Sequence, residues 1–128
     1  MTYVDTSVLL AQHFAEDRLP PDAFWAGPLV SSRLAEYEVW TRVHARQAGT
    51  THGDAARDLL ARVSWLELLP NVLARALDPF PVSVRTLDAL HLASARFLQQ
   101  LAPALALATY DVRLASAARA LGLAVVEP

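Results

Sequence analysis

The sequence predicts a single α/β domain built on a mostly parallel β-sheet. Short apolar segments of strand length alternate with longer segments of helical character along the whole chain. No internal repeat or low-complexity tract interrupts this alternation. The length of 128 residues, with 54% hydrophobic and 19% charged residues, is typical of one globular domain. We therefore expect one domain over residues 1–128.

The first half of the chain is predicted to contain three strands and the helices between them. Residues 2–5 are β-prone and run into a helical segment at 8–11, and the residues from Asp22 to Trp25 form a brief helix before a Gly-Pro pair. The remaining elements expected here are a strand over 29–31, a helix over 33–48, a helix from Thr51 or Asp54 to about residue 63, and an alternating strand over 65–69.

The second half is predicted to end in a strand–helix–strand unit. A continuous apolar run over 105–109 has the character of a strand covered on both faces. The elements expected here are a helix over 72–77, a helix from Thr86 or Asp88 to about residue 101, the strand over 105–109, a helix over 111–121 and a last strand over 123–126.

The composition excludes several classes of protein. Cysteine is absent, which excludes disulfide scaffolds, Cys-ligated zinc, iron–sulfur clusters and thiol nucleophiles. The net charge of -2 does not indicate a broad polyanion-binding surface, although all 11 basic residues are arginines, which suit phosphate and carboxylate. No apolar run reaches the ~18–20 residues that cross a bilayer, and the N-terminus lacks a signal-peptide pattern, so we expect a cytoplasmic protein without a membrane segment.

Three aspartates are predicted to lie near one edge of the sheet. Asp5 ends the first strand, and Asp111 follows the strand over 105–109 within two residues. If these strands are parallel neighbours, both carboxylates lie at the edge where such sheets bind ligands. Asp88 starts a helix among apolar residues and is expected to be partly buried. Each aspartate alone is well explained as a helix cap, but three clustered carboxylates favour a divalent cation site.

The long middle helix offers two further acids, Glu36 and Glu38. They lie on different stripes of the helix, and the periodicity leaves both open. A Gly-rich phosphate loop, a Gly-x-Ser-x-Gly motif and zinc-type histidine spacing are all missing from the sequence. We interpret His91 as a packed, hydrogen-bonded helix residue, with a supporting role beside the acids as the alternative.

Four segments, in this order, carry a resemblance to a known family. They are Tyr3-Val4-Asp5-Thr6-Ser7, then Ser31-Ser32-Arg33-Leu34 before a helical Glu, then Leu87-Asp88-Ala89-Leu90-His91-Leu92-Ala93, and finally Thr109-Tyr110-Asp111-Val112-Arg113-Leu114. The sequence thereby resembles the PIN-domain family, and within it the VapC-type toxin ribonucleases of type II toxin–antitoxin systems. The similarity covers nearly the whole chain.

The resemblance implies a three-layer α/β/α sandwich with a central, mostly parallel sheet. It also implies an endoribonuclease that hydrolyses RNA with Mg²⁺ or Mn²⁺ held by acidic side chains. Asp5 and Asp88 match the firmest metal-binding positions of the family, and Asp111 matches the later acid. The helical Glu of the family lies six residues after the Ser that starts the helix, which selects Glu38 over Glu36. These four acids are the expected catalytic and metal-binding residues.

Supporting residues and partners follow from the same resemblance. Ser7 and Thr109 are expected to hydrogen-bond metal-bound waters or to cap helices, and Arg85 and Arg113 to contact the substrate phosphate or to neutralise the acids. We expect RNA with single-stranded loops as the substrate, a cognate antitoxin protein as a partner, and a homodimer. The hydrophobic content of 54% favours such apolar interfaces, with the helices over about 33–63 as their candidate location and a large core as the alternative explanation. Two alternatives stay open: a non-catalytic PIN-like dimerisation or binding module, and another metal-dependent phosphoesterase.

Overall fold

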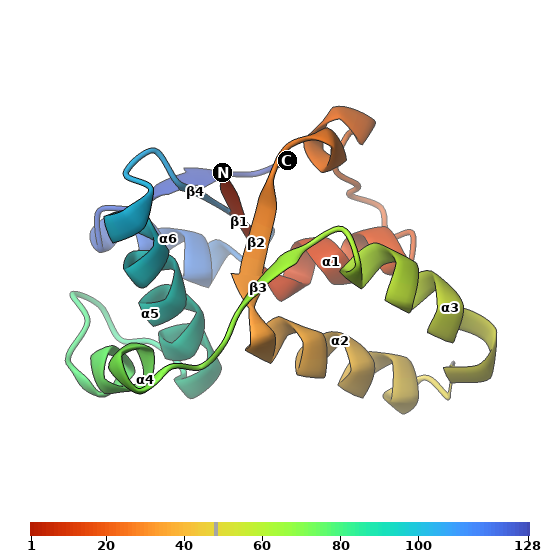
Figure 1. Ribbon diagram of the computed structural model, residues 1–128, viewed down its shortest axis with the longest axis horizontal. Helices are drawn as coiled ribbons and strands as arrows, with labels where there is room; N and C mark the ends of the chain where they lie inside the picture. The colour runs from red at the N-terminus through yellow and green to blue at the C-terminus, as the bar shows by residue number, and fades with distance from the viewer. Residues whose placement is uncertain (48) are drawn as a thin grey trace.

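A parallel β-sheet forms the centre of the computed structural model, which describes residues 1–47 and 49–128 (Figure 1). The five strands of this sheet lie in the order β3-β2-β1-β4-β5, and every pairing is parallel. They are β1 (Thr2–Val4), β2 (Leu29–Ser32), β3 (Ser64–Leu66), β4 (Ala106–Ala108) and β5 (Ala124–Val126). The predicted parallel sheet is confirmed.

Helices cover both faces of the sheet. In Figure 1, α1, α2 and α3 lie to the right of the strands, and α4, α5 and α6 lie to the left. The helices are α1 (Thr6–His13), α2 (Arg33–Ala45), α3 (Gly49–Leu60), α4 (Pro70–Leu77), α5 (Thr86–Leu101) and α6 (Val112–Ala120), with a short 3₁₀ helix, η1, at Asp22–Ala26. The three-layer α/β/α sandwich that the family resemblance implies is therefore confirmed.

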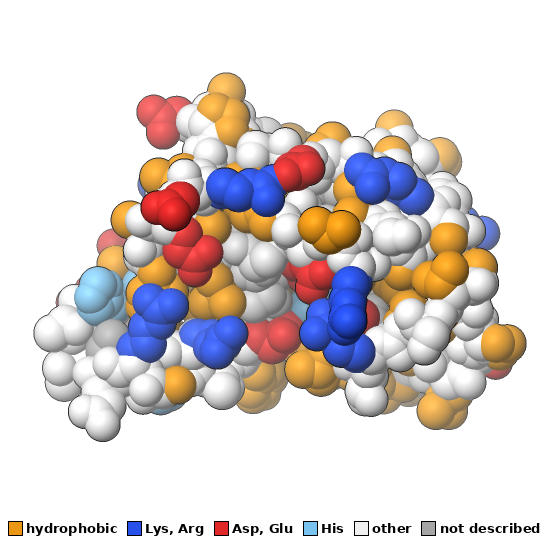
Figure 2. Space-filling model, turned by 180° about the vertical axis from the view of Figure 1, so that it is seen from behind, with side chains coloured by type: hydrophobic (Ala, Val, Ile, Leu, Met, Phe, Trp, Pro, Cys, Tyr) orange, Lys and Arg blue, Asp and Glu red, His pale blue; other side chains and the backbone are white. Residues whose placement is uncertain are grey.

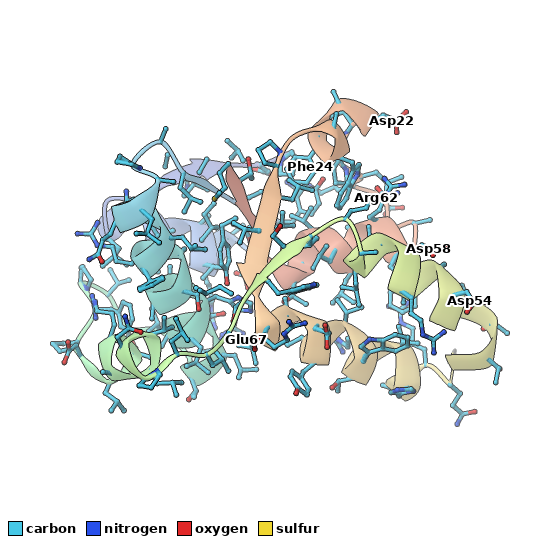
Figure 3. The ribbon with its side chains drawn as sticks, viewed as in Figure 1. Asp22, Phe24, Asp54, Asp58, Arg62 and Glu67 are labelled. Carbon is cyan, nitrogen blue, oxygen red and sulfur yellow. The ribbon has the colours of Figure 1, made fainter. Side chains whose placement is uncertain are left out.

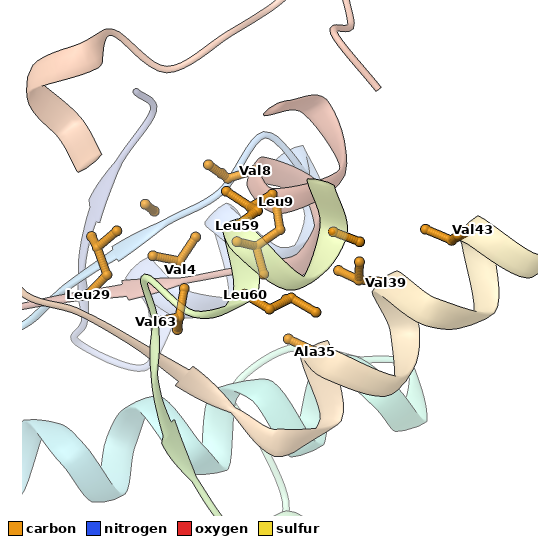
Figure 4. Close-up of a cluster of buried hydrophobic side chains, with 12 residues drawn as sticks. Val4, Val8, Leu9, Leu29, Ala35, Val39, Val43, Leu59, Leu60 and Val63 are labelled. Atoms are coloured by element: carbon orange, nitrogen blue, oxygen red, sulfur yellow. The ribbon is translucent and has the colours of Figure 1, made fainter. Parts of the chain in front are cut away.

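The two faces of the sheet bury two separate hydrophobic clusters, because successive side chains of a strand point to opposite faces. In β1, Val4 belongs to the cluster under α1, α2 and α3, and Tyr3 belongs to the cluster under α5 and α6; both residues are fully buried. Figure 4 shows the first cluster, where Leu9 of α1, Val39 of α2 and Leu60 of α3 pack beside Val4. These contacts fix the helices that carry the site.

Several predicted boundaries are wrong by a few residues. Strand β3 ends at Leu66 rather than at residue 69, because its pairing partner β2 ends at Ser32, opposite Leu66, and α2 begins there. Helix α3 begins at Gly49 rather than at Thr51 or Asp54. Helix α2 ends at Ala45; the predicted end at residue 48 lies outside the described residues.

The carboxyl ends of the strands lie at one edge of the sheet, and three helices begin there. Asp5 follows β1 and caps α1, Ser32 ends β2 and caps α2, and Asp111 lies just after β4 and caps α6. This edge is where ligands of parallel sheets bind. Within the described residues, no helix combines the length and the apolar character needed to cross a bilayer.

Candidate functional site

Asp5 is a buried carboxylate at the carboxyl end of β1. It is only 5% exposed, and its backbone N–H donates to the Ala108 carbonyl across the β1–β4 pairing (2.9 Å). Its Oδ2 accepts hydrogen bonds from the Ser7 N–H (3.2 Å), the Ser7 hydroxyl (2.7 Å) and the Thr109 hydroxyl (2.9 Å). No described residue donates a hydrogen bond to Oδ1. The carboxylate is therefore fixed through Oδ2, while Oδ1 accepts no hydrogen bond from the described residues and lies 3.9 Å from His91 Nε2.

Thr109 and Ser7 join Asp5 to the segment that follows β4. The Thr109 hydroxyl donates to Asp5 and accepts from the Asp111 N–H (2.9 Å). The Ser7 hydroxyl likewise donates to Asp5 and accepts from the Tyr110 N–H (3.0 Å). Both hydroxyls position the acidic residues through direct hydrogen bonds.

Asp5 and Asp111 are both helix N-caps as well as members of the site. Asp111 Oδ1 accepts from the N–H groups of Arg113 (2.9 Å) and Leu114 (3.1 Å) at the start of α6. Capping and clustering are thus compatible, because a cap uses one carboxylate oxygen and leaves the other available.

Glu38 is brought to Asp5 by α2. Its Oε1 accepts a hydrogen bond from the Thr6 hydroxyl (3.0 Å) and lies 2.5 Å from His91 Nε2. On the other side of the ring, His91 Nδ1 lies 2.7 Å from the buried hydroxyl of Tyr3. His91 is packed and hydrogen-bonded, as predicted, and it also holds the acid that α2 contributes.

Glu36, the other candidate of the middle helix, points away from this group. Its carboxylate accepts from Arg33 (2.8 Å), which also donates to Glu67 (2.7 Å) beyond β3. Figure 3 shows Glu67 on the strip of chain that leaves β3. The structure therefore brings Glu38, and not Glu36, to Asp5.

The carboxylates of this part of the site change the pKa of His91. Burial alone lowers the pKa of a histidine, but the hydrogen bond to Glu38 and the nearby charges of Asp5, Glu38 and Asp88 outweigh it and raise the pKa of His91. When protonated, His91 offsets part of the negative charge of the neighbouring carboxylates.

Asp88 and Asp111 are bridged by one arginine. Arg85, the N-cap residue of α5, donates to Asp88 (3.0 Å) and to Asp111 (3.1 Å). The Asp88 side chain is 16% exposed, so the predicted partial burial is confirmed. Arg113 lies exposed in an adjoining hollow of about 600 Å³ that Arg85 and Asp88 also line. Arg85 thus forms ion pairs with both acids, and the two roles predicted for it, neutralising the acids and contacting the substrate phosphate, both stay predictions.

The four predicted acids line a single cleft of about 770 Å³ at the carboxyl edge of the sheet. Figure 2 shows acidic side chains in a hollow near the middle of one face, with arginine side chains on either side of it. Other acids lie elsewhere: Asp54 and Asp58 line the outer side of α3, and Asp22 lies in η1 (Figure 3). The cleft therefore contains the four predicted acids, while these other acidic residues lie outside it.

The pattern of strand-end acids on a five-stranded parallel sheet is that of a known family. A family model described as the PIN domain matches residues 2–120. The chain belongs to the PIN domain family.

Relatives of this PIN domain are named as ribonucleases. Ribonuclease VapC46 of Mycobacterium tuberculosis (strain ATCC 25618 / H37Rv) is 41% identical over 102 residues, which cover 79% of this chain and 75% of the relative. Ribonuclease VapC35 of the same strain is 35% identical over 134 residues, which cover 100% of this chain and 97% of the relative. The resemblance to VapC-type ribonucleases is confirmed.

Solved structures share the fold of this PIN domain. The crystal structure of Mycobacterium tuberculosis VapC20, described as a Sarcin-Ricin loop cleaving toxin, matches with a TM-score of 0.71 and 19% identity, covering 100% of both chains. PAE2754 from Pyrobaculum aerophilum matches with a TM-score of 0.62 and 22% identity, covering 97% of this chain and 81% of the other.

The donor set of the PIN-domain cleft fits a hard divalent cation, because it consists of carboxylate oxygens. Asp5 Oδ1, Glu38 Oε2 and Asp88 Oδ1 receive no hydrogen bond from the described part of the chain. As the side chains stand, no three acidic or histidine groups among residues 1–47 and 49–128 converge closely enough to hold an ion. Arg85, hydrogen-bonded to Asp88 and Asp111, supplies the positive charge between them instead.

Sequence reasoning missed Thr6 and Tyr3. The Thr6 hydroxyl donates a hydrogen bond to Glu38. The position of Thr6 directly after Asp5, an acid at the end of a strand, is the sequence feature that could have indicated a role in the site. Tyr3 of β1 and His91 of α5 are 88 positions apart in the sequence, so no local sequence pattern predicts the contact between them.

Replacing Thr109 by Val tests the support of Asp5. The substitution removes the hydroxyl that donates to Asp5 and accepts from the Asp111 N–H, in a residue only 2% exposed. We expect the free energy of unfolding, measured with urea, to fall by about 1–3 kcal/mol, because buried polar partners lose their hydrogen bonds. The exposed Thr50→Val control should change it by less than about 0.5 kcal/mol. Equal stability of Thr109→Val and wild type would contradict this description of the site.

Proposed function

We propose that this PIN domain is a divalent-metal-dependent endoribonuclease and the toxin of a VapBC-type toxin–antitoxin pair. The observation that carries the proposal is the placement of all four predicted acids in one cleft at the carboxyl edge of the sheet. Relatives named as ribonucleases, aligned over the whole chain, support the same reaction.

Mg²⁺ or Mn²⁺ is the proposed cofactor. Asp5 and Asp88 would be its direct or nearly direct ligands, and Glu38 and Asp111 would hold a second ion or orient the attacking water. When bound, such an ion polarises the phosphodiester and lowers the pKa of a bound water. All four side chains are carboxylates, the ligands that these hard cations prefer.

The residues around the acids prepare the site before substrate arrives. Ser7 and Thr109 fix Asp5, and Thr6 and His91 fix Glu38, so these two carboxylates need little reorganisation during the reaction. Arg85 balances the charge of Asp88 and Asp111 in the resting cleft. When a cation takes over that balance, the same guanidinium is free to contact a substrate phosphate, as is Arg113 beside it.

The proposed partners are an RNA and an antitoxin. Single-stranded loops are the favoured RNA substrate, because their bases and backbone can enter an open cleft. A cognate antitoxin can inhibit by placing a basic side chain among the carboxylates. Arg85 occupies that kind of position within the chain itself, which supports the idea that the cleft accepts a guanidinium.

We also infer that the protein forms a homodimer through α4, rather than through residues 33–63. Two exposed leucines of α4, Leu73 and Leu77 (88% exposed), line a mostly apolar hollow together with Phe80 and Val84. Within the described residues of 33–63, Tyr37 is the one exposed large hydrophobic residue. A second copy is the proposed cover because an apolar surface of this kind is typical of a self-association interface.

Asparagine substitutions at Asp5 and Asp88 test the enzymatic function. We expect Asp5→Asn and Asp88→Asn each to lower RNA cleavage in Mg²⁺ or Mn²⁺ by about 100-fold or more, because each removes a carboxylate charge from the metal site. The control is Asp58→Asn, which changes an exposed acid on α3 and should cleave like wild type. EDTA should abolish cleavage by the wild type.

Other outcomes of this assay separate the alternatives. Cleavage at equal rates by wild type and both site variants would show a contaminating nuclease. Metal binding by the wild type without cleavage of any RNA would favour another metal-dependent phosphoesterase. The absence of both cleavage and a metal-induced rise in melting temperature would favour a non-catalytic binding module.

Replacing Arg85 by Gln tests the competition between this arginine and a metal ion. We expect Arg85→Gln to bind Mn²⁺ about two- to tenfold more tightly in isothermal titration calorimetry, because the ion no longer displaces two partly exposed ion pairs worth about 0–1 kcal/mol each. Arg75→Gln, on α4, should bind the ion like wild type. Unchanged or weaker binding by Arg85→Gln would show that the arginine does not compete.

Replacing Leu77 by Glu tests the proposed interface. We expect wild type to sediment as a dimer at micromolar concentration and Leu77→Glu to sediment as a monomer, because a charge at this position is costly to bury. The matched control is Leu101→Glu, at a residue 72% exposed at the end of α5, and it should stay dimeric. A dimeric Leu77→Glu or a monomeric wild type would refute the assignment.

A further inference from the structure

A second hollow continues from the acidic cleft. Its volume is about 690 Å³. It shares four lining residues with the cleft: Ser7, Leu10, Arg42 and Asp111. The residues that only the second hollow contains are Glu16, Asp17, Arg18 and Tyr110. The two hollows therefore adjoin, and a chain of nucleotides lying in the cleft would lie next to the second hollow.

A stacked pair, Arg18 and Tyr110, forms one wall of the hollow. The guanidinium carbon of Arg18 lies 4.6 Å from the centre of the Tyr110 ring. The Tyr110 hydroxyl donates to the Pro128 carbonyl oxygen (2.7 Å), and Arg18 forms an ion pair with Glu127. The pair is thus fixed to the C-terminal segment, while the Arg18 side chain stays 53% exposed. The guanidinium lies over the Tyr110 ring and the side chain is still half exposed, so a flat ligand can reach it.

The charges of the hollow distinguish a base from a phosphate. Glu16 and Asp17 are exposed and line the hollow beside Arg18, so a phosphate placed there would be repelled. The same carboxylates are good acceptors for the exocyclic amino group of a base. Arg42 differs from Arg18 in two ways: it borders both hollows, and its exposed side chain has no polar partner among the described residues. It is suited to a phosphate between the two hollows.

We propose that the second hollow binds the nucleotide next to the scissile phosphate of a single-stranded RNA. The base of that nucleotide stacks on Arg18, and Arg42 contacts the phosphate that links it to the cleft. Glu16 and Asp17 accept hydrogen bonds from the amino group of the base, which favours cytosine or a purine with an amino group over uracil. This subsite rests on the proposed cleavage of RNA by the neighbouring acids.

The test uses two single-stranded RNA decamers labelled with fluorescein, one of cytidine and one of uridine. They differ in the amino or carbonyl group at position 4 of the base. Binding to full-length Asp5→Asn, which we expect not to cleave, is measured by fluorescence anisotropy in Mg²⁺ over a range of salt concentrations. The same decamers and cellular RNA are incubated with wild type in parallel, to measure cleavage. Each subsite substitution is made in the Asp5→Asn background.

Stacking and charge give different signatures in this experiment. Arg18→Lys keeps the charge and loses the planar group, so affinity for the cytidine decamer should fall about 5- to 100-fold with no change in the salt slope. Arg42→Gln should lower the slope of log affinity against log salt by about 0.7, the value for one phosphate contact in a single strand. The double variant Glu16→Ala, Asp17→Ala should lose the preference for cytidine over uridine.

The control is Arg119→Gln, because Arg119 is exposed in the last turn of α6, at the end of that helix opposite to the site. It should bind both decamers like its parent. If wild type cleaves RNA but Arg18→Lys binds the cytidine decamer like its parent, the subsite is refuted. The subsite is also refuted if the slope of log affinity against log salt is the same for Arg42→Gln and Arg119→Gln. If wild type cleaves no RNA and its Asp5→Asn variant binds neither decamer, the proposed function fails, and the subsite fails with it.

Discussion

The buried charge of Asp5 is the constraint on which the arrangement of the site depends. An ionised carboxylate that is 5% exposed is costly to bury unless hydrogen bonds compensate it. The compensating donors come from Ser7 in the first turn of α1 and from Thr109 at the end of β4. The charge is therefore satisfied only when β1 pairs with β4 and α1 begins directly after β1. The pairing of β1 with β4 thus also fixes the orientation of the Asp5 carboxylate.

The remaining charges around Asp5 form a balanced group. Glu38 is paired with His91, and Arg85 lies between Asp88 and Asp111. Four carboxylates in one cleft repel each other, and Arg85 and, when protonated, His91 reduce the repulsion while Asp5 Oδ1 and Glu38 Oε2 accept no hydrogen bond from the described residues. The resting cleft thus holds positive charge of its own, which a divalent ion can replace. The positive charge that stabilises the carboxylates in the free protein therefore occupies the place that we propose for the metal ion.

Much of the fold and part of the site could be predicted from the sequence, for different reasons. Asp5 and Asp111 follow apolar strands, and parallel neighbours bring such residues to one edge. Glu36 and Glu38 could not be separated by periodicity, because they flank the buried stripe of Ala35, Val39 and Val43 on its two sides. The partners of each acid decide between them: Arg33 for Glu36, and Thr6 with His91 for Glu38. Such contacts join residues 32 and 53 positions apart and leave no local pattern.

The central claim is that these carboxylates together bind a divalent cation. Anomalous diffraction from crystals grown with MnCl₂ tests it most directly. We predict a manganese peak in the cleft, within bonding distance of Asp5 Oδ1 and of Asp88, with Arg85 moved away from the Asp88 carboxylate. A cleft without manganese at millimolar concentration, with Arg85 still bridging Asp88 and Asp111, would contradict it.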